Sequence, residues 1–387
     1  MSLYMNMQQL LDENLKAGKL RTIVAKSQHQ SKIIVDNKDY INLSSNDYLG
    51  LASNLNLAKE FLDSVSGPYI RQSSSGSPLL TGAHESYLEA TEVMESLFNK
   101  SALFFTSGFA ANSGLIGALA TKENLIIADK LAHASIINGI KGAEGKCLRY
   151  AHNDYEHLQR LIEANHEKYD SIIIVTEAVF SMDGDKCDLN ALVALKKRYD
   201  NVYIYVDEAH SFCLYNDNGA GFCASENKLS DIDFILTTFG KGLGSQGACL
   251  LSNKVAHDYF INTTRSLIFS TALSPFTFAH NAFMLKYMQK AQALRDRLYR
   301  ISDFIHETLI ECGYENVSSS QIIPFITGDN DKAIKAFAFF RDNGFYAMPI
   351  RHPTVPLGKA RLRLSLTASL TDSEVEKLAK TIKAFRI

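Results

Sequence analysis

The chain has 387 residues, of which 46% are hydrophobic and 21% charged, and its formal net charge is −2. This length predicts roughly two or three domains, and the composition is typical of a soluble globular protein. A net charge so close to zero gives no electrostatic reason to expect nucleic acid or an anionic membrane as a partner.

The first 20 residues include Asp12 and Glu13 and lack the basic start and apolar run of a signal peptide. No apolar stretch approaches the roughly 20 residues that span a bilayer, so we expect a cytoplasmic protein without membrane contact. The 6 cysteines are scattered, without a C-x-x-C pair or histidines at metal-ligand spacing. We therefore expect neither a disulfide framework nor a metal site.

In chain order, the first predicted elements are an amphipathic helix over residues 5–17 and short strands at 33–35 and 40–43. A helix follows from about residue 84, because its apolar residues share one helical face. Those residues are Tyr87, Ala90, Met94, Leu97 and Phe98.

Short continuous apolar runs come next, as expected of strands buried on both faces of a mostly parallel sheet. The runs are 102–105, 125–128, 171–175, 202–206, 234–236 and 248–251. Helical patterns at 154–165 and 188–199 supply crossovers between them. This alternation predicts an α/β domain with helices on both faces of the sheet.

After about residue 275 the pattern changes to that of a smaller α+β unit. Its predicted elements are a helix over 276–311, a strand over 321–327, a helix over 331–343, strands near 346–350 and 360–366, and a helix over 372–385. We therefore predict three regions: an N-terminal helix with short strands (1–45), a large α/β domain (46–275) and a small C-terminal domain (276–387).

Lys241 directly follows one buried run, in the small and hydroxyl-rich sequence of residues 237–244. A lysine that forms a Schiff base needs a confined site in which desolvation or a cationic neighbour keeps part of the amine neutral. The glycines around it let the backbone approach a ligand closely. The segment does not match the phosphate-binding G-x-x-x-x-G-K-[ST] pattern. Taken alone, a solvated loop lysine is the better explanation.

A second candidate is Asp207, which ends the run 202–206, with His210 three residues later. Ligands of open α/β sheets bind at the carboxyl ends of the strands. A carboxylate there can keep the ring nitrogen of a heterocyclic cofactor protonated. A helix N-cap explains Asp207 equally well.

Three further segments carry weaker signals. The strand-to-helix turn at Gly108 offers free backbone N–H groups suited to a phosphate, although an ordinary turn explains it better. His133 could stack on a planar ring or be a core histidine. Ser181 could be a hydroxyl donor or a plain turn residue.

Taken together and in this order along the chain, these segments favour a functional site over the ordinary explanation of each one. A phosphate-type turn, a histidine, a serine, a strand-end aspartate with its histidine, and a lysine follow one another. With the segments 44–50, 151–154, 175–185 and 350–363, they resemble the α-oxoamine synthase family of fold-type I pyridoxal-phosphate (PLP) enzymes over essentially the whole chain. The resemblance implies an α/β transferase fold and PLP as the cofactor.

The resemblance also implies a role for each residue. Lys241 would bind PLP covalently and move the substrate's Cα proton, Asp207 would pair with the ring nitrogen, and His133 would stack on the ring. The other implied cofactor contacts are Gly108, Phe109, Ser181, His210 and Thr238, with Ser270 and Thr271 donated by the second subunit of a homodimer. The implied substrate contacts are Arg21, Asn46, His133, Thr354 and Arg351. Of these, Arg351 would hold the amino-acid carboxylate.

The likeness is strongest to members that condense L-alanine with a pimeloyl thioester in biotin biosynthesis, on coenzyme A or a carrier protein. It rests on the run 351–356 and on the compact length. Glycine-using members, such as 2-amino-3-ketobutyrate ligases, are the alternative. A non-catalytic subunit that keeps only the fold is disfavoured, because Lys241, Asp207 and Arg351 are all present.

Overall fold

The computed structural model describes residues 2–16, 20–352 and 354–386. Its largest sheet has seven strands in the order β4-β10-β9-β8-β7-β5-β6. Only β10 runs antiparallel to its neighbours β4 and β9, and the other pairs are parallel. The strands are β4 (Ser101–Phe105), β5 (Asn124–Asp129), β6 (Lys146–Tyr150), β7 (Ser171–Glu177), β8 (Val202–Asp207), β9 (Phe234–Thr238) and β10 (Ala248–Ser252).

Helices cover both faces of this sheet, because successive side chains of a buried strand point to opposite faces. In β5, Ile126 and Ala128 join one apolar cluster, while Leu125 and Ile127 join the other. The first cluster includes residues of α4 (Gly108–Leu119), α5 (Ala134–Lys141), α9 (Lys254–Thr263) and α10 (Arg265–Ile268). The second includes residues of α3 (Glu85–Phe98), α6 (Tyr155–Glu163), α7 (Leu189–Arg198) and α11 (Pro275–Met288).

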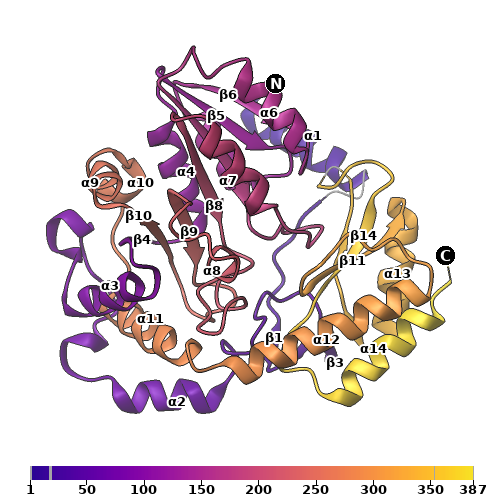
Figure 1. Ribbon diagram of the computed structural model, residues 1–387. Coiled ribbons are helices and arrows are strands. Elements are labelled where there is room, and N and C mark those ends of the chain that lie inside the picture. The colour runs from indigo at the N-terminus through magenta and orange to yellow at the C-terminus, as the bar shows by residue number, and fades with distance from the viewer. Residues whose placement is uncertain (1, 17–19, 353, 387) are drawn as a thin grey trace.

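The C-terminal elements form a second unit beside the sheet, shown from orange to yellow (Figure 1). A three-stranded sheet in the order β11-β14-β13 lies at its centre. Its elements are α12 (Gln292–Glu311), β11 (Ile322–Gly328), α13 (Asn330–Asp342), β12 (Phe345–Tyr346), β13 (Pro349–Ile350), β14 (Ala360–Ser365) and α14 (Asp372–Ala384). A capping box of Thr371 and Glu374 starts α14, which packs against α12.

The N-terminal strands join this second unit rather than standing apart. β1 (Ser27–His29), β2 (Lys32–Val35) and β3 (Lys38–Asn42) form a sheet with β12, and β3 pairs with β12 in parallel. Helix α1 (Leu3–Lys16) buries none of its residues. The remaining short elements are α2 (Leu55–Ser64), η1 (Gly67–Ile70), η2 (Pro78–Gly82) and α8 (Phe222–Ser225). The division of the chain at residues 45 and 275 stays a prediction.

The predicted α/β class with a mostly parallel sheet is confirmed, as are all six buried strands of that sheet. Strand β6 was not predicted, and the helix expected over 276–311 is two helices, α11 and α12. Of the helix predicted over 5–17, residue 17 lies outside the described residues. Within the described residues, no helix is both long and apolar enough to cross a membrane.

Candidate active site

The carboxyl ends of parallel strands gather polar residues at one edge of the large sheet. β7 ends at Glu177, β8 at Asp207 and β9 at Thr238, and Glu177 stands opposite Asp207 in the strand register. A cavity of about 320 Å³ opens there, within the range of small-ligand pockets. The predicted residues that line it are Gly108, Phe109, His133, Asp207, His210, Thr238 and Lys241.

Lys241 lies in the loop after β9, and its Nζ is 2.7 Å from His210 Nε2. Burial lowers the pKa of Lys241 to about 8, although the negative charge of Asp207 opposes this shift. An amine with this pKa is partly neutral near neutral pH. It can therefore act as a nucleophile and as a base.

A hydrogen-bonded chain continues from His210 away from Lys241. His210 Nδ1 is 2.6 Å from Tyr48 Oη, which is 3.1 Å from Asn46 Oδ1. Burial and the charge of Lys241 hold the pKa of His210 well below its ordinary value, so the ring is neutral and carries one N–H. We infer that Nδ1 carries it, because Nε2 then accepts from Lys241 while Tyr48 donates to Asn46.

Asp207 is buried and held from the side of the sheet. Its Oδ2 accepts from Asn112 Nδ2 at 2.7 Å and its Oδ1 from Ala209 N at 2.9 Å. Asn112 is itself fixed, because its Oδ1 accepts from Tyr205 Oη at 2.8 Å. These contacts orient the carboxylate, since its partners are themselves buried.

Glu177 lies beside Asp207 but has a different environment. Burial and the neighbouring Asp207 raise the pKa of Glu177 well above its ordinary value. Its Oε1 has no hydrogen-bond partner among the described residues. Burial at the wall of the cavity therefore disfavours the charged form of Glu177.

The start of α4 forms the opposite wall. Ser107 caps α4, because its side chain accepts a hydrogen bond from Ala110 N. The first backbone N–H groups of α4 have no partner within the helix. A Cβ atom on Gly108 would lie 2.5 Å from Thr238 Cγ2, so a larger residue does not fit there. Thr238 Oγ1 is buried and unpartnered among the described residues. This wall presents donors for an anion such as a phosphate.

The family described as aminotransferase class I and II matches residues 38–382. The chain belongs to this family. Relatives provisionally named 8-amino-7-oxononanoate synthase in Haemophilus influenzae and Neisseria meningitidis are each 44% identical to it over 353 residues. The alignment covers 91% of this chain and 93% of each relative.

Solved members of the aminotransferase class I and II family share the fold. A serine palmitoyltransferase from Sphingomonas wittichii is 26% identical with a TM-score of 0.89, and the match covers 99% of this chain and 98% of that one. An 8-amino-7-oxononanoate synthase from Francisella tularensis is 28% identical with a TM-score of 0.75, over 89% and 97%. The protein is thus a PLP-dependent acyltransferase of the α-oxoamine synthase group.

The residues of this family member fit PLP at the cavity. The part-neutral amine of Lys241 suits an aldehyde, the carboxylate of Asp207 suits a protonated ring nitrogen, and the α4 wall suits a phosphate. The unpartnered Thr238 hydroxyl also fits the phosphate of PLP, because a bound phosphate would give this buried hydroxyl a hydrogen-bond partner. No comparison tests these individual assignments, and they stay predictions.

Ser181 and Asn46 do not line this cavity, but one arginine joins them. Arg363 Nε donates to Ser181 O at 2.6 Å, and its Nη1 donates to Asn46 Oδ1 at 3.0 Å. Arg363 is buried on β14, so the C-terminal unit reaches the site through this side chain.

The other predicted residues lie outside the cavity lining. Ser270 and Thr271 line a separate, narrower pocket next to the end of β4. Arg21 is exposed between α1 and β1. Arg351 follows β13 and is partly buried, and Thr354 is exposed near it. Pro353, in the same predicted run, lies outside the described residues.

Sequence reasoning missed several residues of this site, among them Asn112, Tyr48, Glu177 and Arg363. Glu177 could have been found, because it ends a buried strand as Asp207 does. Asn112 lies one helical turn after Gly108, which is a signal only once the cavity is known. Tyr48 and Arg363 lie in the segments 44–50 and 350–363 that carry the resemblance, but only the tertiary fold brings them to His210 and Ser181.

Capture of PLP by Lys241 should depend on pH in a way set by its lowered pKa. Below about pH 8 the rate should rise roughly tenfold per pH unit, because only the neutral amine attacks the aldehyde, and above it the rate should level off. Stopped-flow absorbance after mixing PLP with the apo protein measures this rate. A rate still rising at about pH 10 would show an ordinary, unperturbed lysine.

Proposed function

We propose that the protein condenses L-alanine with a pimeloyl thioester, with loss of CO₂, to form 8-amino-7-oxononanoate. One observation supports the acyl-transfer chemistry: Lys241, His210 and Asp207 line one cavity, and Lys241 Nζ lies 2.7 Å from His210 Nε2. The choice of substrates rests on the relatives that are 44% identical over 91% of the chain.

When bound, PLP supplies an electron sink that stabilises negative charge on the substrate's Cα. Lys241 Nζ removes the Cα proton, and Asp207 keeps the ring nitrogen protonated while Asn112 fixes its carboxylate. His133, at the cavity wall, would lie against the ring of the cofactor. A bond then forms between Cα and the thioester carbonyl carbon as the thiolate leaves, the substrate carboxylate departs as CO₂, and the proton held on Lys241 Nζ returns to Cα.

Two arginines are proposed to bind the amino-acid carboxylate. Arg351 carries this role by resemblance. Arg363 is supported by geometry, because it donates to Asn46 and leaves further guanidinium N–H groups for a carboxylate. We propose that Arg363 makes the contact nearest to the reacting atoms, and that Arg351 closes the site from β13.

Arg21 is proposed, by resemblance, to pair with the terminal carboxylate of the pimeloyl chain, because leaving that carboxylate unpaired away from water would be costly. Arg21→Ala should therefore reduce kcat/KM for pimeloyl thioester by roughly 10- to 100-fold, the worth of a charged hydrogen bond. An uncharged acyl thioester of similar length should be affected much less. Steady-state kinetics with both thioesters measures the difference, and Lys26→Ala, in the same exposed stretch, is the matched control.

The same assay tests the function itself when L-alanine, glycine and L-serine are each paired with pimeloyl, acetyl and palmitoyl thioesters. The proposal requires alanine with the pimeloyl thioester to give the highest kcat/KM. Preference for glycine with acetyl thioester, or for serine with palmitoyl thioester, would overturn the substrate assignment and leave the acyltransferase class standing.

We also propose a homodimer in which Ser270 and Thr271 complete the partner's site, because neither residue lines the cavity of its own chain. Coexpressing a Lys241→Ala chain with a Ser270→Ala/Thr271→Ala chain should then create heterodimers with one intact site. Random pairing predicts about a quarter of wild-type activity, while each variant alone is nearly inactive. Absence of rescue in purified heterodimers would place both residues in their own chain's site.

A further inference from the structure

The turn that carries Ser181, residues 180–186 between β7 and α7, is closed by its own backbone. Phe180 N donates to Asp185 O at 2.9 Å, and Gly184 N donates to Phe180 O at 2.9 Å. We call these residues the Ser181 turn. Because these hydrogen bonds close the turn, a displacement of Asp185 or Gly184 also displaces Ser181.

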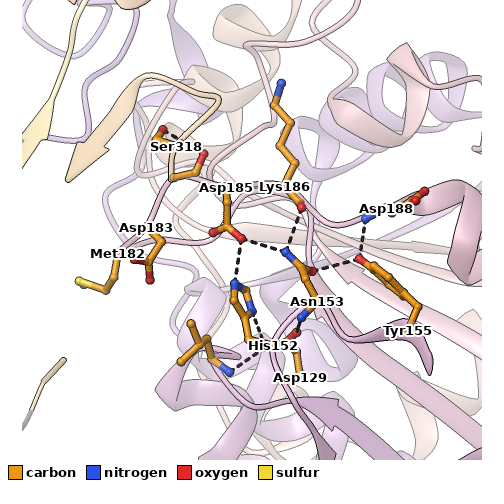
Figure 2. A network of polar contacts seen from close by, with 12 residues as sticks. Asp129, His152, Asn153, Tyr155, Met182, Asp183, Asp185, Lys186, Asp188 and Ser318 are labelled. Atoms are coloured by element: carbon orange, nitrogen blue, oxygen red, sulfur yellow. Dashed lines mark hydrogen bonds and ion pairs between the residues drawn. The ribbon is translucent and has the colours of Figure 1, made fainter. Parts of the chain in front are cut away.

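On the side of the large sheet, His152 links the Ser181 turn to β5, because it bonds to Asp185 of the turn and to Asp129 of the strand (Figure 2). Its Nδ1 is 2.9 Å from Asp129 Oδ1 and its Nε2 is 2.8 Å from Asp185 Oδ2. A neutral imidazole has one N–H, so only the protonated ring can donate to both. Burial alone would lower the pKa of His152, but the bonds to Asp129 and Asp185 raise it to about 10.

Asp129 extends this contact toward His133. Its Oδ1 also accepts from Leu131 N at 2.7 Å, and its Oδ2 accepts from Asn153 N at 3.1 Å. Asp129 is fully buried at the end of β5, and His133, four residues later, caps the start of α5. One imidazolium therefore joins the segment leading to His133 with the Ser181 turn.

The C-terminal unit holds the same turn from the other side. Arg361 Nη1 pairs with Asp183 Oδ1, and Arg363 Nε donates to Ser181 O at 2.6 Å. Gly184 has φ +70°, and a Cβ atom there would lie 2.0 Å from the carbonyl oxygen of the first residue of β11. The turn is thus packed between the large sheet and two strands of the C-terminal unit, β11 and β14, of which β14 carries both arginines.

We propose that His152, as an imidazolium, is a positioning residue that fixes the Ser181 turn and through it places Arg363 for the amino-acid substrate. His152 does not line the cavity, so it acts through other residues. The inference rests on the proposed function, because the substrate role of Arg363 belongs to that proposal. A displacement near 1 Å at a substrate contact can cost roughly 100-fold in rate, so such a contact matters.

The test uses the charge of His152 rather than its presence. The charged groups that face it are Asp129 on β5 and Asp185 on the Ser181 turn, and the Phe180 ring packs edge-on against it. Asp185→Asn removes one of the two carboxylates that raise its pKa while keeping an oxygen acceptor. The imidazolium, stable to about pH 10 in the wild type, should then lose its proton within the assay range.

The kcat/KM for the amino acid, expressed as variant over wild type, should therefore fall about tenfold between about pH 7 and pH 9 in Asp185→Asn, mostly through KM. His152→Gln should be impaired by roughly 10- to 100-fold with a ratio that does not change with pH. The double variant His152→Gln/Asp185→Asn should also lack the pH dependence, because the imidazole that would titrate is absent.

Asp188→Asn is the matched control. Asp188 lies near the same network, but its carboxylate caps α7, and asparagine caps a helix equally well. Its ratio to the wild type should be constant across the pH range. The proposal would be overturned if the kcat/KM of Asp185→Asn relative to the wild type were also constant with pH, with kcat lowered as much as KM is raised. His152 would then be a purely structural residue.

Hydrogen exchange of the peptide covering 179–187 separates this inference from the proposed function. In Asp185→Asn, exchange of this peptide relative to the wild type at the same pH should increase toward about pH 9, with or without substrate. If the wild type makes no product from alanine, the proposed function fails while this result still stands. Exchange that matches the wild type at every pH would refute the positioning role on its own.

Discussion

Replacing Lys241 by alanine is expected to reduce turnover by roughly 10⁴-fold, the upper end of what a general base contributes, because the same amine also binds the cofactor. Lys241 lines the cavity, burial lowers its pKa to about 8, and its Nζ lies 2.7 Å from His210. PLP should still bind noncovalently, since the α4 wall and Asp207 are unchanged.

Borohydride reduction followed by peptide mass analysis measures the covalent link, which should attach PLP to Lys241 in the wild type and be absent in the variant. Lys100→Ala is the matched control, because burial also lowers the pKa of Lys100, which bonds to Ile232 O far from the cavity. Turnover by Lys241→Ala near the wild-type rate would remove this lysine from the mechanism.

Asp207→Asn is expected to retain PLP but to lose roughly 10- to 1000-fold in kcat. An opposite charge at hydrogen-bond distance shifts a pKa by roughly one to three units, and each unit is a tenfold change in the protonated fraction of the ring nitrogen. Asn112 Nδ2 can still donate to the remaining side-chain oxygen, so the fold of the site should persist.

Glu177→Gln provides the comparison, because Glu177 lines the same cavity and its raised pKa disfavours its charged form. It should cost far less than Asp207→Asn. Single-turnover absorbance with PLP and alanine, together with kcat for both variants, measures the two effects. Equal losses would mean that the charge of Asp207 is not what supports the ring.

The buried strands were predictable because each is a continuous apolar run bounded by polar residues. β6 was missed because it is an edge strand: Lys146 and Arg149 are exposed and only Tyr150 is buried. The long pattern over 276–311 hid a break at residues 289–291, which lacks glycine and proline as a signal. Pattern shows where apolar faces lie, but it does not show where a helix bends away to form a new contact.

The candidate site was predictable where it follows strand ends. Asp207, Thr238 and Lys241 are local to buried runs, and the parallel sheet brings their ends together. Arg363 and Tyr48 are different, because they meet only when β14 of the C-terminal unit packs near the N-terminal segment. Such long-range contacts leave no periodic trace in a single sequence.

The position of Ser270 and Thr271 shows a further limit. In one chain they line their own narrow pocket rather than the main cavity, so no feature of a single subunit connects them with a phosphate. Their assignment comes from resemblance alone, and the heterodimer experiment decides it.

The most direct test of the proposed reaction follows the carbon atoms of the amino acid. The PLP-loaded protein is incubated with pimeloyl thioester and with L-alanine labelled at either the carboxyl or the methyl carbon, and the products are identified by mass. The account predicts 8-amino-7-oxononanoate that keeps the methyl label, with the carboxyl label released as CO₂. A product that keeps the carboxyl label, or no product from alanine where glycine reacts, would contradict it.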